Sequence, residues 1–150
     1  MTNMTLKQVQ PDQSLNETLK AMNQLENLTL KNQNFIDWTK KVFANDCRDC
    51  IPFKVWEFIY NHFRYVDDQY DEVIRAPYVL LYEKIGDCDD FALFAHTVLK
   101  ILGFKPMYIM FGEYRNRFTH IAVFCNDKII DGVNQNFNVI PIKYNFYKTV

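Results

Sequence analysis

The sequence predicts an α+β fold in which a helical N-terminal half is followed by a small antiparallel sheet. From residue 12 to about residue 102, apolar side chains recur at the spacing of amphipathic helices. After Gly103 the period changes to two, which is typical of half-buried strands. Helices first and strands afterwards indicate the α+β class. The chain has 150 residues, of which 49% are hydrophobic, so a packed core is expected.

Composition and charge argue against several classes of function. A net charge of −1 leaves no basic surface for nucleic acid. No apolar run approaches the length of about 18 residues that crosses a membrane. The first residues lack the basic and apolar stretches of a secretion signal. We therefore expect a cytoplasmic protein with reduced cysteines and with neither a nucleic-acid nor a membrane partner.

The N-terminal elements follow from helical spacing and capping residues. Residues 1–11 are polar and predicted to be loose. A helix over about residues 12–30 begins at Asp12 or Ser14 as its cap. Its apolar face could pack on the core, cover a groove or dock on a partner, and packing is the usual outcome. That face consists of Leu15, Leu19, Met22, Leu25 and Leu28. A second helix runs from Phe35 to about Ala44, and Pro52 opens a third.

The remaining elements are predicted in the same way. Residues 64–76 have no clean period and are predicted to form a long loop, which in a compact domain is often functional. Pro77 begins a short helix that ends near Lys84, and Asp87 caps a strong helix that Gly103 ends. Strands are predicted over residues 107–111, 119–125, 128–132 and 137–142. The aromatic run at residues 144–147 reads as a last strand or as the wall of a substrate groove.

The segment Gly86-Asp87-Cys88-Asp89-Asp90-Phe91-Ala92 carries the most chemical information. It places Cys88 in the first turn of a predicted helix, where unpaired amides and the helix dipole favour a thiolate. A thiolate is a competent nucleophile, and the same amides can hold an oxyanion. Neighbouring aspartates oppose ionisation, although Asp87 and Asp89 could instead cap the helix and point away. We expect an ionised sulfur.

A cysteine nucleophile needs a base, and the chain has 3 histidines. His62 lies near the end of the third predicted helix. His96 lies too far along the helix of Cys88 to reach it. His120, in the strand that follows Thr119, is therefore the candidate base.

An acidic partner for His120 follows from strand register. If Asn126-Asp127 is a two-residue hairpin turn, Ala122 faces Asp131. Because side chains alternate, His120 shares the face of Ala122, and Asp131 becomes its diagonal neighbour at about 7 Å or less between Cβ atoms. A carboxylate there can fix the imidazole tautomer. A slip of one residue would place it on the opposite face.

Together these residues resemble the transglutaminase-like, papain-type superfamily of cysteine proteases and acyltransferases, in particular its small bacterial or phage members. The resemblance covers about residues 53–132. It is carried by the cysteine helix with its Leu102-Gly103 end, Thr119-His120, Ile130-Asp131-Gly132, and the preceding segments at residues 63–68 and 73–77. It implies a core over residues 46–150, with accessory helices in residues 1–45 packing on it. It also implies Cys88 as nucleophile, His120 as base and Asp131 as the orienting acid.

The resemblance further implies acyl transfer at an amide carbonyl through a thioester, with a protein or peptide substrate and no cofactor or metal. Peptide hydrolysis is expected first, and glutamine-directed transfer or deamidation second. An inactive transglutaminase-like binding or structural protein is the alternative. Calcium regulation is not implied, because the chain is much shorter than the multidomain cross-linking enzymes. For the aromatic donor that completes the oxyanion site in some members, Trp56, Tyr65 and Tyr82 are unranked candidates.

Two further groups of residues could carry other chemistry. Cys47-Arg48-Asp49-Cys50 lacks the second cysteine pair of a zinc site and the preceding strand of a thioredoxin-like motif, so two ordinary thiols are expected, with a labile disulfide next. Cys125 alternates away from His120 and is expected in the core. A hard cation could bind the aspartates, but their spacing fits no EF-hand and a solvated acidic rim is expected. These aspartates are Asp67, Asp68, Asp71, Asp87, Asp89 and Asp90.

Overall fold

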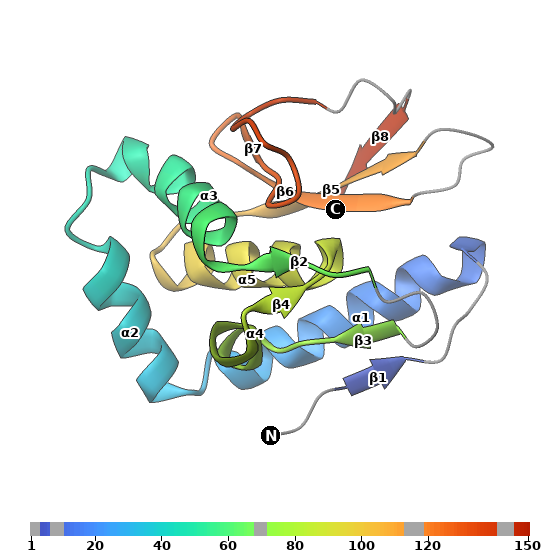
Figure 1. Ribbon diagram of the computed structural model, residues 1–150, viewed down its shortest axis with the longest axis horizontal. Helices are drawn as coiled ribbons and strands as arrows, with labels where there is room; N and C mark the ends of the chain where they lie inside the picture. The colour runs from blue at the N-terminus through green and yellow to red at the C-terminus, as the bar shows by residue number, and fades with distance from the viewer. Residues whose placement is uncertain (1–3, 7–10, 68–71, 113–118, 141–145) are drawn as a thin grey trace.

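The computed structural model describes residues 4–6, 11–67, 72–112, 119–140 and 146–150 (Figure 1). The helices are α1 (Pro11–Thr29), α2 (Gln33–Phe43), α3 (Ile51–His62), α4 (Pro77–Glu83) and α5 (Cys88–Ile101), with a 3-10 turn, η1 (Arg48–Cys50). The strands are β1 (Met4–Leu6), β2 (Arg64–Tyr65), β3 (Glu72–Ile74), β4 (Ile85–Gly86), β5 (Met107–Gly112), β6 (His120–Cys125), β7 (Lys128–Ile130) and β8 (Phe146–Thr149). The predicted α+β class is confirmed.

A four-stranded sheet packs on the central helix. Its order is β7-β6-β5-β8, and every neighbouring pair is antiparallel. Helix α5 contacts β5 and β6 and lies between this sheet and α1 (Figure 1). Along β6, Ile121, Val123 and Cys125 belong to the main core, whereas Ala122 belongs to a smaller apolar cluster. This alternation agrees with the predicted period of two and with the predicted core position of Cys125.

Helix α5 begins and ends at the predicted residues for local reasons. The Asp87 side chain accepts from the Asp90 N–H at 3.3 Å, and the Asp90 side chain accepts from the Asp87 N–H at 3.0 Å. This reciprocal capping box satisfies two amides that a helix start otherwise leaves open. At the other end, Gly103 has φ +88°, a left-handed conformation that glycine adopts without strain. The body of α5 is buried from Asp90 to Leu99, which positions its first turn rigidly.

Helix α1 packs on α4 and α5, the usual outcome for its apolar face. Met22 and Leu25 are buried in the main core, as the helical spacing predicts, and Ala21 is buried there as well. The prediction for Leu28 is wrong, because its side chain is 56% exposed. The buried face instead continues through Glu26, a charged residue that the apolar pattern does not reveal. None of the helices within the described ranges is long and apolar enough to span a bilayer.

Three segments differ from their predicted structure. Residues 4–6 are not loose, because β1 pairs antiparallel with β3. Residues 64–76 are not one loop, since they contain β2, paired in parallel with β4, as well as β3. Such short strands leave too few residues for a detectable period.

The strand predicted over residues 137–142 is absent in its described part, residues 137–140. Asn138 takes the partner's place at β7, where it donates its N–H to the Ile129 oxygen at 3.1 Å and accepts the Ile129 N–H on its side-chain oxygen at 2.9 Å. Residues 141 and 142 lie outside the described residues. In the run at residues 144–147, Tyr144 and Asn145 also lie outside, while Phe146 and Tyr147 belong to β8, so a last strand is confirmed there.

Candidate active site

Cys88 opens α5 at a point where the chain is held on both sides. Parallel pairing places Tyr65 opposite Gly86, and the Val66 N–H donates to the Gly86 oxygen at 2.8 Å. A Cβ on Gly86 would lie 2.8 Å from Asp90 Oδ2, so only glycine fits beneath the capping box. The turn into α5 therefore depends on a missing side chain, and it fixes where Cys88 begins the helix.

The Cys88 sulfur lies against the start of β6. A backbone hydrogen bond from Ile121, the residue after His120, reaches the sulfur. The thiol also lies 4.0 Å from Asp89 Oδ1, a long contact for a thiol donor. The sulfur thus contacts the backbone of β6 one residue away from His120, although Cys88 and His120 are far apart in sequence.

The electrostatic surroundings of Cys88 contradict the predicted ionised sulfur. Burial and the charges of Asp89 and Asp87 raise the pKa of Cys88 well above its ordinary value. The Ile121 hydrogen bond acts in the opposite direction, and Asp131 adds a further, smaller rise. Burial of the sulfur is the largest cause of the rise, and the neighbouring carboxylates add to it. At neutral pH the sulfur is a thiol that needs a base.

His120 and Asp131 meet as the hairpin register predicts. Asn126 and Asp127 have φ 51° and 60°, the two positive values of a type I′ turn. Cys125 then pairs with Lys128, which carries Asp131 to the diagonal position. The His120 Nε2 lies 2.7 Å from Asp131 Oδ2. With Nε2 engaged by the carboxylate, Nδ1 is the second ring nitrogen through which a proton can move.

The Asp131 carboxylate is held by neighbouring groups rather than by solvent. Its side chain is buried, and Oδ1 accepts the Val133 N–H at 3.1 Å. The Trp56 Nε1 donates to the Asp131 carbonyl oxygen at 3.1 Å and to the Asn134 carbonyl oxygen at 3.3 Å. The Trp56 indole on α3 therefore anchors the turn after β7. The position of this turn orients the Asp131 carboxylate toward His120.

Gly132 lets this turn approach the helices closely. A Cβ there would lie 2.5 Å from Ile59 Cγ2 on α3 and 3.0 Å from Phe91 Cδ2 on α5. The imidazole of His120 is supported from the sheet, since its ring stacks on Phe111 with centroids 5.9 Å apart. The Asp131–His120 pair is thus fixed by packing from α3, α5 and β5.

The structure ranks the three aromatic candidates for the oxyanion site. Trp56 already uses its N–H on backbone carbonyls, and Tyr82 is 75% exposed at the end of α4. Tyr65 is 45% exposed and sits beside Gly86, with its ring against Phe91. Burial, followed by the charge of Cys88 and then those of nearby aspartates, raises the pKa of Tyr65 to about 12. Of the three, Tyr65 is therefore the residue whose phenol is influenced by Cys88.

The prediction of a solvated acidic rim is wrong for two of its members, Asp87 and Asp90, which are buried. Asp90 accepts from the Arg75 backbone N–H at 2.6 Å and from Arg75 Nη1 at 2.9 Å. Burial raises the pKa of Asp90, and hydrogen bonds from Arg75 and Asp87 offset part of the rise. Asp68 and Asp71 lie outside the described residues. Across the described ranges, no group of three or more His, Cys, Asp or Glu side chains could hold a metal ion.

Three residues that support the site escape sequence reasoning. Arg75 ties the segment after β3 to the start of α5 through Asp90, and no spacing within a predicted loop signals such a contact. Trp56 and Gly132 were visible as an apolar helix position and as part of the Asp-Gly pair, but their contacts join distant segments. Only tertiary structure reveals these supporting roles.

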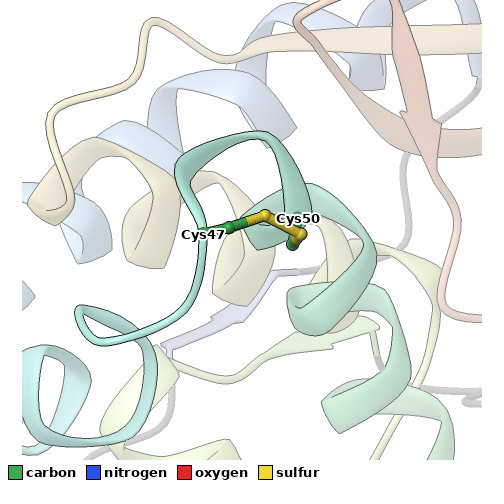
Figure 2. Close-up of a disulfide and its surroundings, with 2 residues drawn as sticks. All are labelled: Cys47 and Cys50. Atoms are coloured by element: carbon green, nitrogen blue, oxygen red, sulfur yellow. A yellow bond between two sulfur atoms is a disulfide. The ribbon is translucent and has the colours of Figure 1, made fainter.

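The other histidines and cysteines lie in separate settings. The His62 Nδ1 lies 3.0 Å from the Phe58 oxygen of its own helix, and the His96 Nδ1 lies 2.5 Å from Glu26 Oε2. The prediction of two thiols at Cys47 and Cys50 is wrong, because a disulfide joins them (Figure 2). Turn η1 brings their Cα atoms to 5.1 Å, within disulfide range.

The fold and the site define a class: α+β domains that present a cysteine at a helix start beside a strand that carries a histidine paired with an aspartate. The chain belongs to the transglutaminase-like domain family, whose model matches residues 13–148. This match confirms the resemblance drawn from the sequence. No curated protein sequence matches the chain.

Several solved structures are similar to this chain. A candidate cysteine protease from Cytophaga hutchinsonii superposes with a TM-score of 0.53 at 16% identity, covering 67% of this chain and 37% of that protein. Legionella pneumophila LapG gives a TM-score of 0.53 at 18% identity, covering 77% and 75% of the two chains. A candidate protease from Parabacteroides distasonis gives 0.59 at 11% identity, covering 83% and 26%. These likenesses support the fold, and the chain spans well under half the length of the first and third proteins.

Proposed function

We propose that this protein is a cysteine-dependent acyl-transfer enzyme that hydrolyses peptide bonds, with Cys88 as nucleophile, His120 as base and Asp131 as the orienting acid. One observation carries the proposal. The Cys88 sulfur is hydrogen-bonded at the residue next to His120, and the His120 ring lies 2.7 Å from the Asp131 carboxylate. Membership of the transglutaminase-like family and the likeness to candidate cysteine proteases support it.

In the proposed mechanism, proton transfer accompanies nucleophilic attack. Because the pKa of Cys88 is raised, the thiol gives its proton to His120 Nδ1 as the sulfur attacks the amide carbonyl. Asp131 holds Nε2–H and stabilises the imidazolium that forms. The imidazolium then protonates the leaving amine as the C–N bond breaks, which leaves a thioester on Cys88. His120 next takes a proton from water, whose oxygen attacks the thioester and releases the acid and the thiol.

The oxyanion of each tetrahedral intermediate would lie at the start of α5. First-turn N–H groups of a helix have no partner within the helix, so the Cys88 amide can donate there. The Tyr65 hydroxyl is the proposed side-chain donor, because Tyr65 pairs with Gly86, two residues before Cys88, and the charge of Cys88 influences its pKa. An amine in place of water would resolve the same thioester by transfer, and deamidation would follow from a glutamine substrate.

A non-catalytic transglutaminase-like binding protein is the second candidate. The raised pKa of Cys88 favours it, since a strongly acidic and buried setting lowers the reactivity of a thiol. The two candidates differ in whether Cys88 reacts with a substrate-like electrophile faster than an ordinary thiol.

The test uses a peptide with an electrophilic warhead and mass spectrometry of the labelled residue. We expect covalent capture at Cys88, loss of capture in Cys88→Ala, and at least about a hundredfold slower capture in His120→Ala. Asp131→Asn is expected to slow capture strongly, and Asp127→Asn on the neighbouring turn is the matched control. If Cys88 reacts no faster than a small-molecule thiol, and His120→Ala leaves that rate unchanged, the protein is not an enzyme of this type.

A further inference from the structure

The connection between α2 and α3 carries a disulfide that the proposed catalysis does not use. Cys47 and Cys50 are joined across a sequence separation of 3, and both residues are exposed (Figure 2). We propose that this disulfide is a reversible redox site that exchanges with thiols from solvent. It would be a second cysteine centre, chemically separate from Cys88.

The turn that holds the two cysteines is fixed by contacts that involve no sulfur. Within η1, the Cys50 N–H donates to the Cys47 oxygen at 2.9 Å. Arg48, between the cysteines, donates from Nη1 to the Leu102 oxygen at 3.1 Å and from Nη2 to the Gly103 oxygen at 3.2 Å. The guanidinium thus docks the turn on the C-terminal end of α5, where a helix leaves carbonyl groups without partners.

Further contacts hold the turn on both sides. The Arg48 guanidinium carbon lies 4.1 Å from the centroid of the Phe104 ring, which adds a cation–π contact. Directly after Cys50, the buried residues Ile51 and Pro52 begin α3. Once the S–S bond is broken, these contacts keep the two Cα atoms near their separation of 5.1 Å. The reduced pair therefore retains a high effective concentration of one thiol at the other, which favours re-formation.

Exposure and loop size distinguish this disulfide from a structural staple. A cross-link stabilises a fold chiefly by restricting the unfolded chain, and a loop closed by cysteines three positions apart restricts it little. Both cysteines are exposed, so an attacking thiolate can reach them, and exposed disulfides are the more labile ones. In a reducing compartment, the disulfides that do form are usually short-lived and serve catalysis or redox sensing.

The proposed exchange uses two equivalents of a low-molecular-weight thiol such as glutathione. One thiolate attacks a sulfur of the pair, the Cys47–Cys50 bond breaks, and a mixed disulfide forms while the other cysteine leaves as a thiolate. A second thiol attacks the mixed disulfide and releases oxidised glutathione. The protein gains two electrons and two protons and becomes a dithiol, and oxidised glutathione reverses the process.

The test equilibrates the full chain in buffers with graded ratios of reduced to oxidised glutathione. Samples are quenched in acid, alkylated, and the state of the Cys47–Cys50 peptide is read by mass spectrometry. We expect half of the Cys47–Cys50 pairs to be reduced in a buffer that contains appreciable amounts of both reduced and oxidised glutathione. We also expect a Cys47→Ser/Cys50→Ser double variant to lose no more than about 6 °C of its thermal midpoint, because so short a loop restricts the unfolded chain little.

The docking contacts are tested with charge-matched variants. Arg48→Ala is expected to make the disulfide easier to reduce, by about tenfold in the half-reduction ratio, since the thiols lose pre-organisation. Lys54→Ala removes one positive charge from the nearby start of α3, where Lys54 forms an exposed ion pair with Glu57 at 3.5 Å, and should leave the ratio within about twofold. If Arg48→Ala does not fold, Arg48→Lys, which keeps the charge but not the forked contact, gives the same measurement.

Three results would overturn the proposal. A disulfide that stays oxidised in a large excess of reduced glutathione is a staple. A protein that forms no disulfide in oxidised glutathione has two ordinary thiols. Equal half-reduction ratios for the Arg48 and Lys54 variants would remove the pre-organisation on which the argument rests.

Discussion

A buried charged cluster ties α1 to α5 and gives the sharpest stability prediction. Glu26 is 2% exposed, and its carboxylate meets three α5 side chains. The His96 Nδ1 lies 2.5 Å from it, and the Thr97 hydroxyl and Lys100 Nζ each donate to it at 3.2 Å. Burial would raise the pKa of Glu26, but the hydrogen bonds and charges of His96 and then Lys100 leave that pKa below its ordinary value.

Replacing this carboxylate removes the acceptor for all three donors at once. A buried hydrogen bond to a charged group is worth about 1.5–3 kcal/mol, which applies to His96. The Lys100 side chain is 50% exposed, so solvent reduces its share to about 0.5 kcal/mol. Thr97 keeps a second partner in the Leu93 oxygen at 2.7 Å. We therefore expect Glu26→Ala to lower the free energy of unfolding by about 3 kcal/mol, near the lower end of the cost of breaking a buried ion pair.

The assay is urea unfolding followed by circular dichroism, with Glu57→Ala as the control. Glu57 forms an exposed ion pair with Lys54 at 3.5 Å, so its loss should cost under about 0.5 kcal/mol. Because the pKa of Glu26 is lowered in the folded state, its charge contribution is complete above the ordinary value of 4.5 and is lost as the pH falls through the folded value. The gap between the parent protein and Glu26→Ala should therefore narrow in acid. A loss below about 1 kcal/mol at neutral pH, or a gap independent of pH, would refute the reasoning.

Three further predictions follow from the site. Gly132→Ala should lower the free energy of unfolding by about 1–3 kcal/mol in urea titrations, because the added Cβ has no room between α3 and α5; an unchanged midpoint would contradict this close approach. Asp89→Asn should lower the pKa of Cys88 and speed its alkylation at pH 7.5 by about threefold, with Asp127→Asn as the charge-matched control; equal rates would argue against a carboxylate effect. Trp56→Phe should cost about 1–2 kcal/mol through lost indole hydrogen bonds, and a neutral effect would count against that anchoring role.

The His120–Asp131 contact was predictable because it is local. A two-residue turn and strict side-chain alternation fix which residues of neighbouring strands face each other, and both features can be seen in the sequence. The approach of Cys88 to the start of β6 is not local. It depends on how α5 packs against the sheet, so only the family resemblance pointed to it.

The missed features share one physical cause, which is pairing between distant segments. Arg75 lies in a segment without a period, yet its guanidinium and amide both bind Asp90. Glu26 interrupts an apolar helix face because three donors from α5 meet it there. Spacing rules describe faces of single elements, whereas a charged residue becomes buried only when its partners come from elsewhere.

The reversal at Cys88 has a different origin, because the aspartates that oppose ionisation are its sequence neighbours, whereas its burial comes from the tertiary fold. In the run Asp87-Cys88-Asp89-Asp90, the last aspartate is held by Arg75. Burial, and then the charges of Asp89 and Asp87, raise the pKa of the thiol. A nucleophile with a raised pKa needs a base that takes its proton during attack. For that reason the proposed activity depends mainly on the alignment of His120 by Asp131 before the substrate binds. Stabilisation of a thiolate by the start of α5 contributes less.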